Sequence, residues 1–192
     1  MRLSILIPSI PERFEAVIPL VDKLQKQSEG KEVEILLLCD NKKMSIGSKR
    51  QKLKELAIGE YWAFVDDDDD ISEDYIDQLL KGCESCKDVI TFHQWSTING
   101  EGFLVQFGLD YENQDATQVD GQWKNIKRSP FHVCAWKSSV VKNCFFSDKN
   151  YGEDWDFCKF AIKEVISEHN IPKILHYYKY DDQITQAFES DN

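Results

Sequence analysis

Three short apolar runs, separated by segments with helical spacing, constrain the fold of this chain more than any other feature. The runs are Leu3–Pro8, Val33–Asp40 and Glu60–Asp66, and each has the length and composition of a buried strand. A chain that alternates strand and helix places its strands in a mainly parallel sheet with helices on both faces. The sequence therefore predicts an α/β fold, and its 192 residues fit one domain.

The segments between these runs carry the predicted helices. Apolar residues recur every three or four positions from Phe14, and this helix is expected to end by Gly30. A second helix is expected over 46–57 and a third over 70–82, where Asp70 and Glu73 form a capping-box pattern.

The second half of the chain has a different pattern. Two β-rich runs around Asn99-Gly100 predict a hairpin within 88–108. The remaining expectations are an irregular surface loop over 109–127, a short strand entering a helix over 131–141, a helix over 153–169 that ends at His169, a strand over 173–180 and a polar tail over 181–192.

Charge and cysteine content restrict the classes of function. The net charge of −11 argues against unspecific adhesion to nucleic acid or to an anionic membrane surface. No run approaches the roughly 20 apolar residues of a membrane span, and none has the form of a signal peptide. The six cysteines are then most simply reduced thiols. We expect a soluble cytoplasmic protein.

Five consecutive aspartates, Asp66–Asp70, follow the third apolar run directly. Ligands of open parallel sheets bind beyond the carboxyl ends of the strands, and Asp40 reaches the same edge as Asp66. If the chain stays extended, Asp66 and Asp68 share one side. Crowded carboxylates repel one another, and a bound Mg²⁺ or Mn²⁺ that also holds nucleotide phosphates removes this repulsion. Alternatively, Asp69 and Asp70 are only anions at a helix start, or the whole run is solvated.

Arg50 is expected on the inner face of the second predicted helix. It lies four residues after Ile46 and three before Leu53, so it shares their side. An inward guanidinium near a helix start is suited to clamping phosphate, and the neighbouring Lys49 could assist or be solvated. The alternative for Arg50 is an ion pair with one of the aspartates.

Several of these segments together resemble the nucleotide-sugar glycosyltransferases of the GT-A fold, closest in pattern to family 2. The similar stretches are "SILIPSIPERFE", "VEILLLCDN", "GSKRQKLKELAIGEYWAFVDDDDDISEDYI", "NYGEDWDF" and "ILHYYKY", over roughly Leu3 to Tyr180. Two positions depart from the family pattern, because Ile10-Pro11 replaces the usual Tyr-Asn and Asn41 replaces a second acid. The resemblance implies a nucleotide-binding half over 1–82 and an acceptor-side half over 83–180.

The resemblance also implies roles on the donor side. Asp40 would read the base, expected to be uracil, and Ser9 and Glu12 would line the same pocket. Asp66 and Asp68 take the D-x-D positions, with Asp67 between them. The implied nucleotide-sugar contacts are Ser9, Glu12, Asp40, Lys49, Arg50, Asp66, Asp67 and Trp155, and the implied ligands of Mn²⁺ or Mg²⁺ are Asp68 and His176.

On the acceptor side the resemblance implies that Asp154 or Glu153 is the catalytic base, with Asp154 favoured by the family pattern. The alternative for both is stabilisation of a helix start. His132, His93 and Trp95 are further candidates for acceptor contact, although His132 is equally a core histidine on a strand. The basic stretch 124–128 could bind a phosphorylated acceptor or a nucleic-acid strand, or be a solvated loop.

The expected activity is metal-dependent, inverting transfer of a hexose or pentose from a nucleotide diphosphate sugar, expected to be a UDP-sugar, to an acceptor hydroxyl. The acceptor could be a surface glycan or a hydroxymethylated base in phage DNA, and the resemblance implies a bacterial cytoplasm, or that of the host if a phage encodes the protein. Two alternatives remain open. One is a nucleotidyltransferase that makes nucleotide sugars, although the opening turn lacks the glycines typical of that class. The other is a non-catalytic sugar- or metal-binding module of the same fold.

Overall fold

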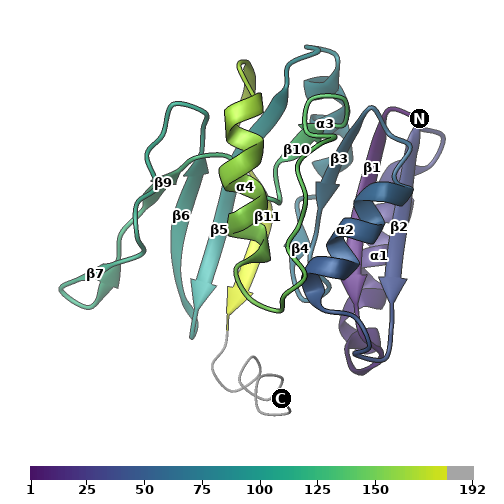
Figure 1. Cartoon of the computed structure of the whole chain (residues 1–192). Coiled ribbons are helices and arrows are strands. Elements are labelled where there is room, and N and C mark those ends of the chain that lie inside the picture. The colour runs from purple at the N-terminus through teal and green to yellow at the C-terminus, as the bar shows by residue number, and fades with distance from the viewer. Residues whose placement is uncertain (181–192) are drawn as a thin grey trace.

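A nine-stranded sheet forms the centre of the protein within residues 1–180, which are the residues that this computed structural model describes (Figure 1). The polar tail expected over 181–192 lies outside the described residues. Seven strands follow one another across the sheet: β2 (Val33–Cys39), β1 (Leu3–Ser9), β3 (Tyr61–Phe64), β10 (Ala135–Lys137), β5 (Val89–Ile98), β11 (Glu168–Tyr180) and β4 (Asp70–Ile71). The other two, β6 (Glu101–Phe107) and β9 (Ile126–Arg128), extend the sheet beyond β5.

The sheet is mixed but mostly parallel, as expected. β1 pairs in parallel with β2 and β3, and β5 pairs in parallel with β11 over most of its length. The short strands β10 and β4 run antiparallel to their neighbours, and so does the hairpin partner β6. The expected alternation of strand and helix therefore holds for the first half of the chain.

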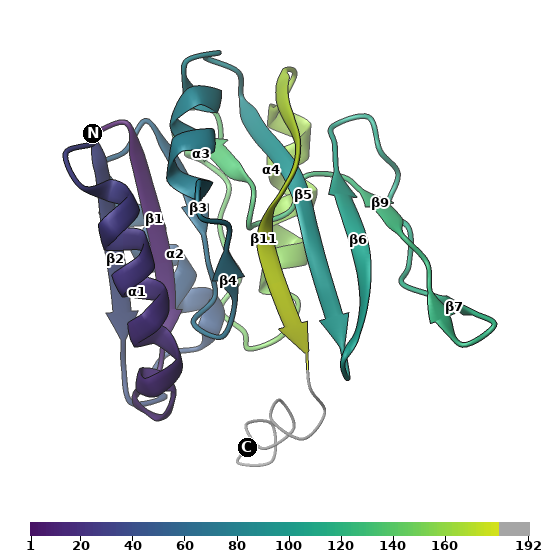
Figure 2. The same cartoon turned by 180° about the vertical axis from the view of Figure 1, so that it is seen from behind.

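Helices cover both faces of the sheet. The helices α2 (Ile46–Leu56) and α4 (Glu153–Glu164) lie on the face that is in front in Figure 1, whereas α1 (Phe14–Ser28) and α3 (Tyr75–Cys83) lie on the opposite face, which is in front in Figure 2. A short 3-10 turn, η1 (Pro11–Arg13), leads into α1. Because β1 and β3 are covered on both sides, every one of their residues is buried.

Aromatic side chains fill the layer between the sheet and α4. Phe146 and Phe157 stack with their ring centres 4.4 Å apart, and Trp62 from β3 contacts both Phe64 and Phe157. Burying side chains of this size contributes about 1.5–3 kcal/mol each. This packing holds the start of α4 against the end of β3.

The predicted hairpin is present, and its turn explains why the sequence signalled it. Asn99 and Gly100 both have positive φ, at 49° and 86°, as the tight turns that join two antiparallel strands require. The expected loop over 109–127 is largely irregular, but it includes a two-stranded ribbon of β7 (Gln118–Val119) and β8 (Gln122–Trp123) and reaches the start of β9.

Several expected elements differ from the structure, and the strand expected over 173–180 already begins at Glu168, as β11. The third helix begins at Tyr75 rather than at Asp70, because Ile71 is fully buried and pairs with His176 as part of β4. No helix follows β10 within 131–141. The helix expected over 153–169 ends at Glu164, and His169 belongs to β11, where it pairs with Ile90. For the helices expected to start at Asp70 and to end at His169, pairing within the sheet overrode a local helical pattern, whereas residues 138–140 form a turn.

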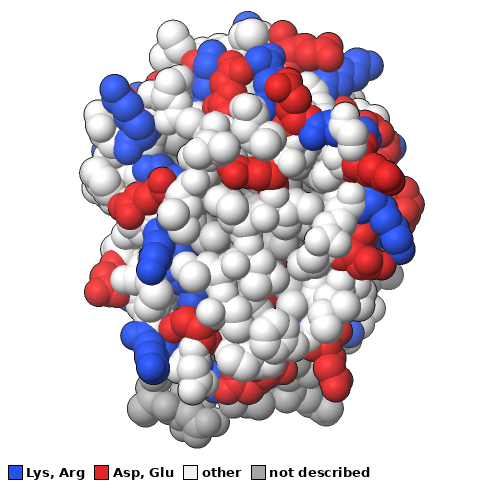
Figure 3. Space-filling view, turned by 90° about the vertical axis from the view of Figure 1, so that its right-hand side faces the viewer, with Lys and Arg blue, Asp and Glu red and all other residues white. Residues whose placement is uncertain are grey.

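The edge of the sheet at β2 is seen face-on in Figure 3. Charged side chains gather around the rim of this face, and its centre is largely uncharged. No helix within residues 1–180 is long and apolar enough to cross a membrane.

Candidate active site

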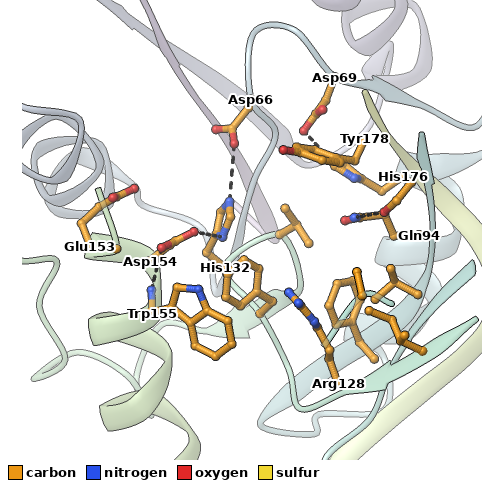
Figure 4. Close-up of a pocket in the computed structure, with 18 of the residues that line it drawn as sticks. Asp66, Asp69, Gln94, Arg128, His132, Glu153, Asp154, Trp155, His176 and Tyr178 are labelled. Carbon is orange, nitrogen blue, oxygen red and sulfur yellow. Dashed lines mark hydrogen bonds and ion pairs between the residues drawn. The ribbon is translucent and has the colours of Figure 1, made fainter. Parts of the chain in front are cut away.

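A cavity of about 490 Å³ lies between the strands β5, β6, β9 and β11 and the start of α4 (Figure 4). Its lining has two chemically different parts. The polar part comprises Arg50, Asp66, Asp69, His132, Glu153, Asp154 and His176. The apolar part comprises Ile98, Phe103, Val105, Phe107, Ile126 and Phe131. A cavity that joins a charged wall to an apolar wall is suited to binding a small molecule.

Asp40 follows β2 and is held firmly at the carboxyl edge of the parallel strands. Its Oδ1 lies 2.5 Å from Lys49 Nζ, and its Oδ2 accepts hydrogen bonds from the backbone N–H groups of Lys43 and Met44. Burial opposes the ionised carboxylate, but these partners outweigh it and keep the pKa of Asp40 below its ordinary value. Lys49 is itself buried and donates to the carbonyl of Ser9 at 2.7 Å.

Ser9, at the end of β1, lies beside the aspartate run. Its hydroxyl donates to Asp67 Oδ2 at 2.7 Å, and Arg13 Nη1 lies 2.7 Å from Asp67 Oδ1 and 2.9 Å from Asp68 Oδ2. Arg13 is a member of this cluster that the sequence analysis did not identify. Glu12, next to it, is exposed and pairs with Lys42 at 3.3 Å.

The aspartate run turns instead of staying extended. The backbone N–H of Asp69 donates to the carbonyl of Asp66 at 3.1 Å, which closes a tight turn. The side chains of Asp66 and Asp68 therefore have different partners: Asp66 faces Arg50, and Asp68 faces Arg13. Burial and the neighbouring carboxylates together raise the pKa of Asp68 to about 7, against the pull of Arg13. The negative charge of Asp68 is therefore only partly compensated by Arg13.

Arg50 connects the end of β3 to the start of α4. Its Nη2 lies 2.8 Å from Asp66 Oδ1, its Nε lies 3.1 Å from Glu153 Oε1, and the guanidinium is buried. Burial works against both charges of the Arg50–Asp66 pair, but their attraction outweighs it, so the pKa of Asp66 is lowered and that of Arg50 is raised. The ion pair considered as an alternative for Arg50 is thus made, and Arg50 Nη1 remains buried without a hydrogen-bond partner among the described residues.

His176 on β11 contacts Asp69. Its Nε2 lies 3.2 Å from Asp69 Oδ2, both side chains are buried, and burial raises the pKa of Asp69. His176 was expected to act with Asp68. In the structure, Asp68 forms an ion pair with Arg13 instead. Asp69 Oδ1 and His176 Nδ1 lack hydrogen-bond partners in the described part of the chain.

A divalent ion is compatible with the Asp69–His176 pair. Residues 1–180 gather no three histidine, cysteine or acidic side chains into a ready-made metal cluster. Mg²⁺ and Mn²⁺ do not need one when a nucleotide is bound, because they take one or two protein ligands and complete the shell with phosphate oxygens and water. An unpartnered carboxylate oxygen beside an imidazole, with the crowded Asp68 next to it, fits that requirement.

His132 lies between two carboxylates. Its Nε2 is 3.5 Å from Asp66 Oδ2 and its Nδ1 is 3.6 Å from Asp154 Oδ2 (Figure 4). His132 is in a turn that precedes β10, not on a strand. Asp154 also accepts a hydrogen bond from the backbone N–H of Trp155 at 2.7 Å. Of the two acids at the start of α4, Glu153 is committed to Arg50, whereas Asp154 faces the cavity.

The remaining predicted site residues differ in whether they line the cavity. Trp155 lines the cavity, whereas His93 and Trp95 are not among its lining residues, because Gln94 and Ser96 occupy that face of β5. Gln94, Ser96, Tyr178 and Arg128 line the cavity as well, and the sequence analysis did not single them out individually. Because side chains alternate between the two faces of a strand, β5 and β11 would have indicated Gln94, Ser96 and Tyr178 if the face that lines the cavity had been known.

Comparison with known proteins identifies the fold. No protein-family model matches the chain, and no curated protein matches it in sequence. Among solved structures it resembles TarS of S. aureus. The match to TarS 1-349 in complex with UDP-GlcNAc has a TM-score of 0.65 and 12% identity, and it covers 94% of this chain and 59% of that chain.

Two other TarS structures give the same result. TarS 1-349 matches with a TM-score of 0.67 and 16% identity over 93% of this chain and 60% of that one. TarS 1-349 in complex with UDP matches with a TM-score of 0.64 and 13% identity over 95% and 62%. The chain therefore spans about 60% of the length of these structures. At such low identity the likeness concerns the fold, and it confirms the expected GT-A fold.

Proposed function

We propose that this protein is a metal-dependent, inverting glycosyltransferase that moves a sugar from a nucleotide diphosphate sugar, most simply a UDP-sugar, to an acceptor hydroxyl. One observation carries the proposal: at the carboxyl edge of a GT-A sheet, Asp66 and Asp69 of the aspartate run, Arg50 and His176 meet Asp154 from a distant helix in one cavity. Solved structures of the same fold include TarS in complex with UDP-GlcNAc and with UDP.

In the proposed donor site, the nucleoside lies against Ser9, Glu12 and Asp40. Asp40 is ionised and held in place, so it can accept hydrogen bonds from the N–H of a base without rearranging. Asp66 and Asp67 border the ribose side, and both are already fixed by arginines. This prior fixing lowers the entropic cost of binding.

For the diphosphate, Asp69 and His176, with Asp68 beside them, would hold Mn²⁺ or Mg²⁺. When bound, the ion would offset the negative charge that develops on the leaving diphosphate. Arg50 and Lys49 add fixed positive charge to the same wall, although each is already paired with a carboxylate. Their contribution is therefore electrostatic support from behind the acidic groups rather than a free phosphate clamp.

The acceptor hydroxyl is deprotonated by Asp154 in this mechanism. Its carboxylate faces the cavity, and His132 and the Trp155 N–H hold it in position. Glu153 is a positioning residue, because its carboxylate is bound to Arg50. A single base opposite the leaving group implies direct displacement with inversion. A glycan or a modified DNA base remains the proposed acceptor, and the cytoplasmic location stays a prediction.

A panel of nucleotide sugars with and without Mn²⁺ tests this function by thermal shift. We expect UDP-sugars to raise the melting temperature only in the presence of the ion, because the ion and the diphosphate bind together. An enzyme of this class should also release UDP slowly from its donor in the absence of acceptor. If no nucleotide sugar stabilises the protein under any of these conditions, the proposal is wrong.

A further inference from the structure

Arg128 on β9 is a cation in the cavity that forms no close ion pair with a carboxylate of residues 1–180. Two arginines line the cavity, Arg50 and Arg128. Arg50 is neutralised by Asp66 and Glu153, but no carboxylate of residues 1–180 forms an ion pair with Arg128 within 4.0 Å. Its Nε donates a long hydrogen bond, 3.4 Å, to the carbonyl of Gln114, and its guanidinium carbon lies 5.6 Å from the centre of the Trp155 ring.

This lack of a partner is costly for the free protein. Arg128 is half-buried, and burial lowers its pKa by more than the charges of Asp115 and Asp154 raise it. An arginine nevertheless stays protonated. In a protein with a net charge of −11, a partly desolvated guanidinium that faces a cavity is suited to an anion supplied by a ligand.

The wall next to Arg128 is apolar. Phe103 and Val105 of β6 and Ile126 of β9 present buried side chains to the cavity, and Phe131 packs edge-on against Trp155 with ring centres 5.4 Å apart. The polar groups of β5 in this region, Gln94 and Ser96, are hydrogen-bonded to each other at 2.8 Å. A sugar with many hydroxyl groups would find few partners here, whereas an aromatic ring or an alkyl chain would be well accommodated.

We propose that this part of the cavity is the acceptor subsite, and that it selects an acceptor with a phosphate or carboxylate group next to an apolar ring or chain. The inference rests on the proposed function. The Trp155 ring lies under the Arg128 guanidinium, and the backbone N–H of Trp155 donates to Asp154. In Figure 4 Arg128 extends from β9 toward this part of the cavity. An anion bound there therefore places the rest of a compact acceptor beside Asp154.

Binding of simple probes in the presence of saturating UDP and Mn²⁺ tests the subsite, because UDP occupies the donor site. The probes are phenyl phosphate, benzoate and uncharged phenol, and their affinities are measured by titration calorimetry or NMR. Phenyl phosphate or benzoate should bind the wild-type protein, and Arg128→Gln should weaken that binding by about tenfold or more. Phenol should bind more weakly than the two anions, and its affinity should be the same for the wild-type protein and Arg128→Gln.

Lys127→Gln is the matched control, because Lys127 is the exposed neighbour of Arg128 on β9 and lies over Tyr111 rather than in the cavity. It should leave all three affinities unchanged. Arg128→Lys, which keeps the charge, should restore part of the anion binding and separates charge from folding. Stronger binding of phenyl phosphate than of benzoate assigns a phosphate acceptor, and the reverse assigns a carboxylate.

Two results would overturn the inference: equal affinity of the anionic probes for wild-type protein and Arg128→Gln, or equal affinity of phenol and the anions. Failure of the proposed function is measured separately, by the absence of UDP binding in the same wild-type sample. In that case the proposed acceptor role of the Arg128 subsite is also wrong.

Discussion

Arg50 holds Glu153, which lies 103 residues further along the chain, with its Nε 3.1 Å from the Glu153 carboxylate. The same guanidinium also holds Asp66 at the end of β3. One buried cation thus joins the edge of the sheet that carries the aspartate run to the helix that carries Asp154. The position of the aspartate run relative to Asp154 depends on this contact.

Arg50→Met is expected to lower the free energy of unfolding by about 3 kcal/mol, because it removes the cation that pairs with the buried Glu153 carboxylate and the partly buried Asp66 carboxylate. Urea denaturation measures the loss. Lys26→Met removes an exposed ion pair with Asp22 and should cost about 0.5 kcal/mol or less. Similar losses in the two variants would show that the Arg50 contacts do not hold the site together.

Asp154→Asn should reduce the turnover number at least about 100-fold while leaving the affinity for UDP unchanged, because only the proton acceptor is removed. Steady-state kinetics and UDP titration give the two quantities. Asp156→Asn is the matched control: Asp156 lies on the same turn of α4 but pairs with Lys149 and Ser147. A normal turnover number for Asp154→Asn would exclude Asp154 as the base.

Asp69→Asn should abolish the part of donor binding that depends on Mn²⁺, since it removes a carboxylate beside His176 without changing the volume of the side chain. Thermal shift with UDP-GlcNAc, with the ion and with chelator, measures this dependence. Asp70→Asn alters the next residue of the same run, which is exposed and paired with Lys23, and should behave like the wild type. An unchanged Mn²⁺ response in Asp69→Asn would contradict the proposed ion site.

Asp68→Asn should stabilise the free protein at pH 8 and have less effect at pH 5. The pKa of Asp68 is raised from 3.8 to about 7 in the folded protein, so its favourable contribution exists below pH 4 and is lost as the pH rises through about 7. Because the side chain is 39% exposed, solvent screening should limit the effect to about 1 kcal/mol or less. Thermal unfolding at several pH values measures it, with Asp70→Asn as the reference. A difference that does not vary with pH would contradict the raised pKa.

The sequence predicted the fold well because its evidence was local. Apolar runs identified β1, β2 and β3, and the Asn99-Gly100 pair identified the hairpin. The errors arose where a distant strand supplied the hydrogen bonds. The sequence around Asp70 and Ile71 has the pattern of a helix start. These two residues instead pair with His176 and Tyr177 of β11, which come much later in the chain.

The same reason explains how far the site could be predicted. That Asp66 lies at a strand end follows from the sequence, but the tight turn closed by Asp69 does not, and this turn decides which aspartate meets His176. The approach of Arg13 to the run is a tertiary contact between distant segments. Such contacts depend on the packing of whole elements, which no short motif specifies.

The place of β11 between β5 and β4 has a consequence for biosynthesis. A nascent chain emerging from the ribosome lacks this strand until residues 168–180 have been made. Until then, the edge of β5 that pairs with β11 has no hydrogen-bonding partner from that strand. Long-range parallel pairing of this kind is slow to form and leaves the waiting edge prone to aggregation. Because His176 lies on the same strand, the proposed ion site should form only after β11 has paired.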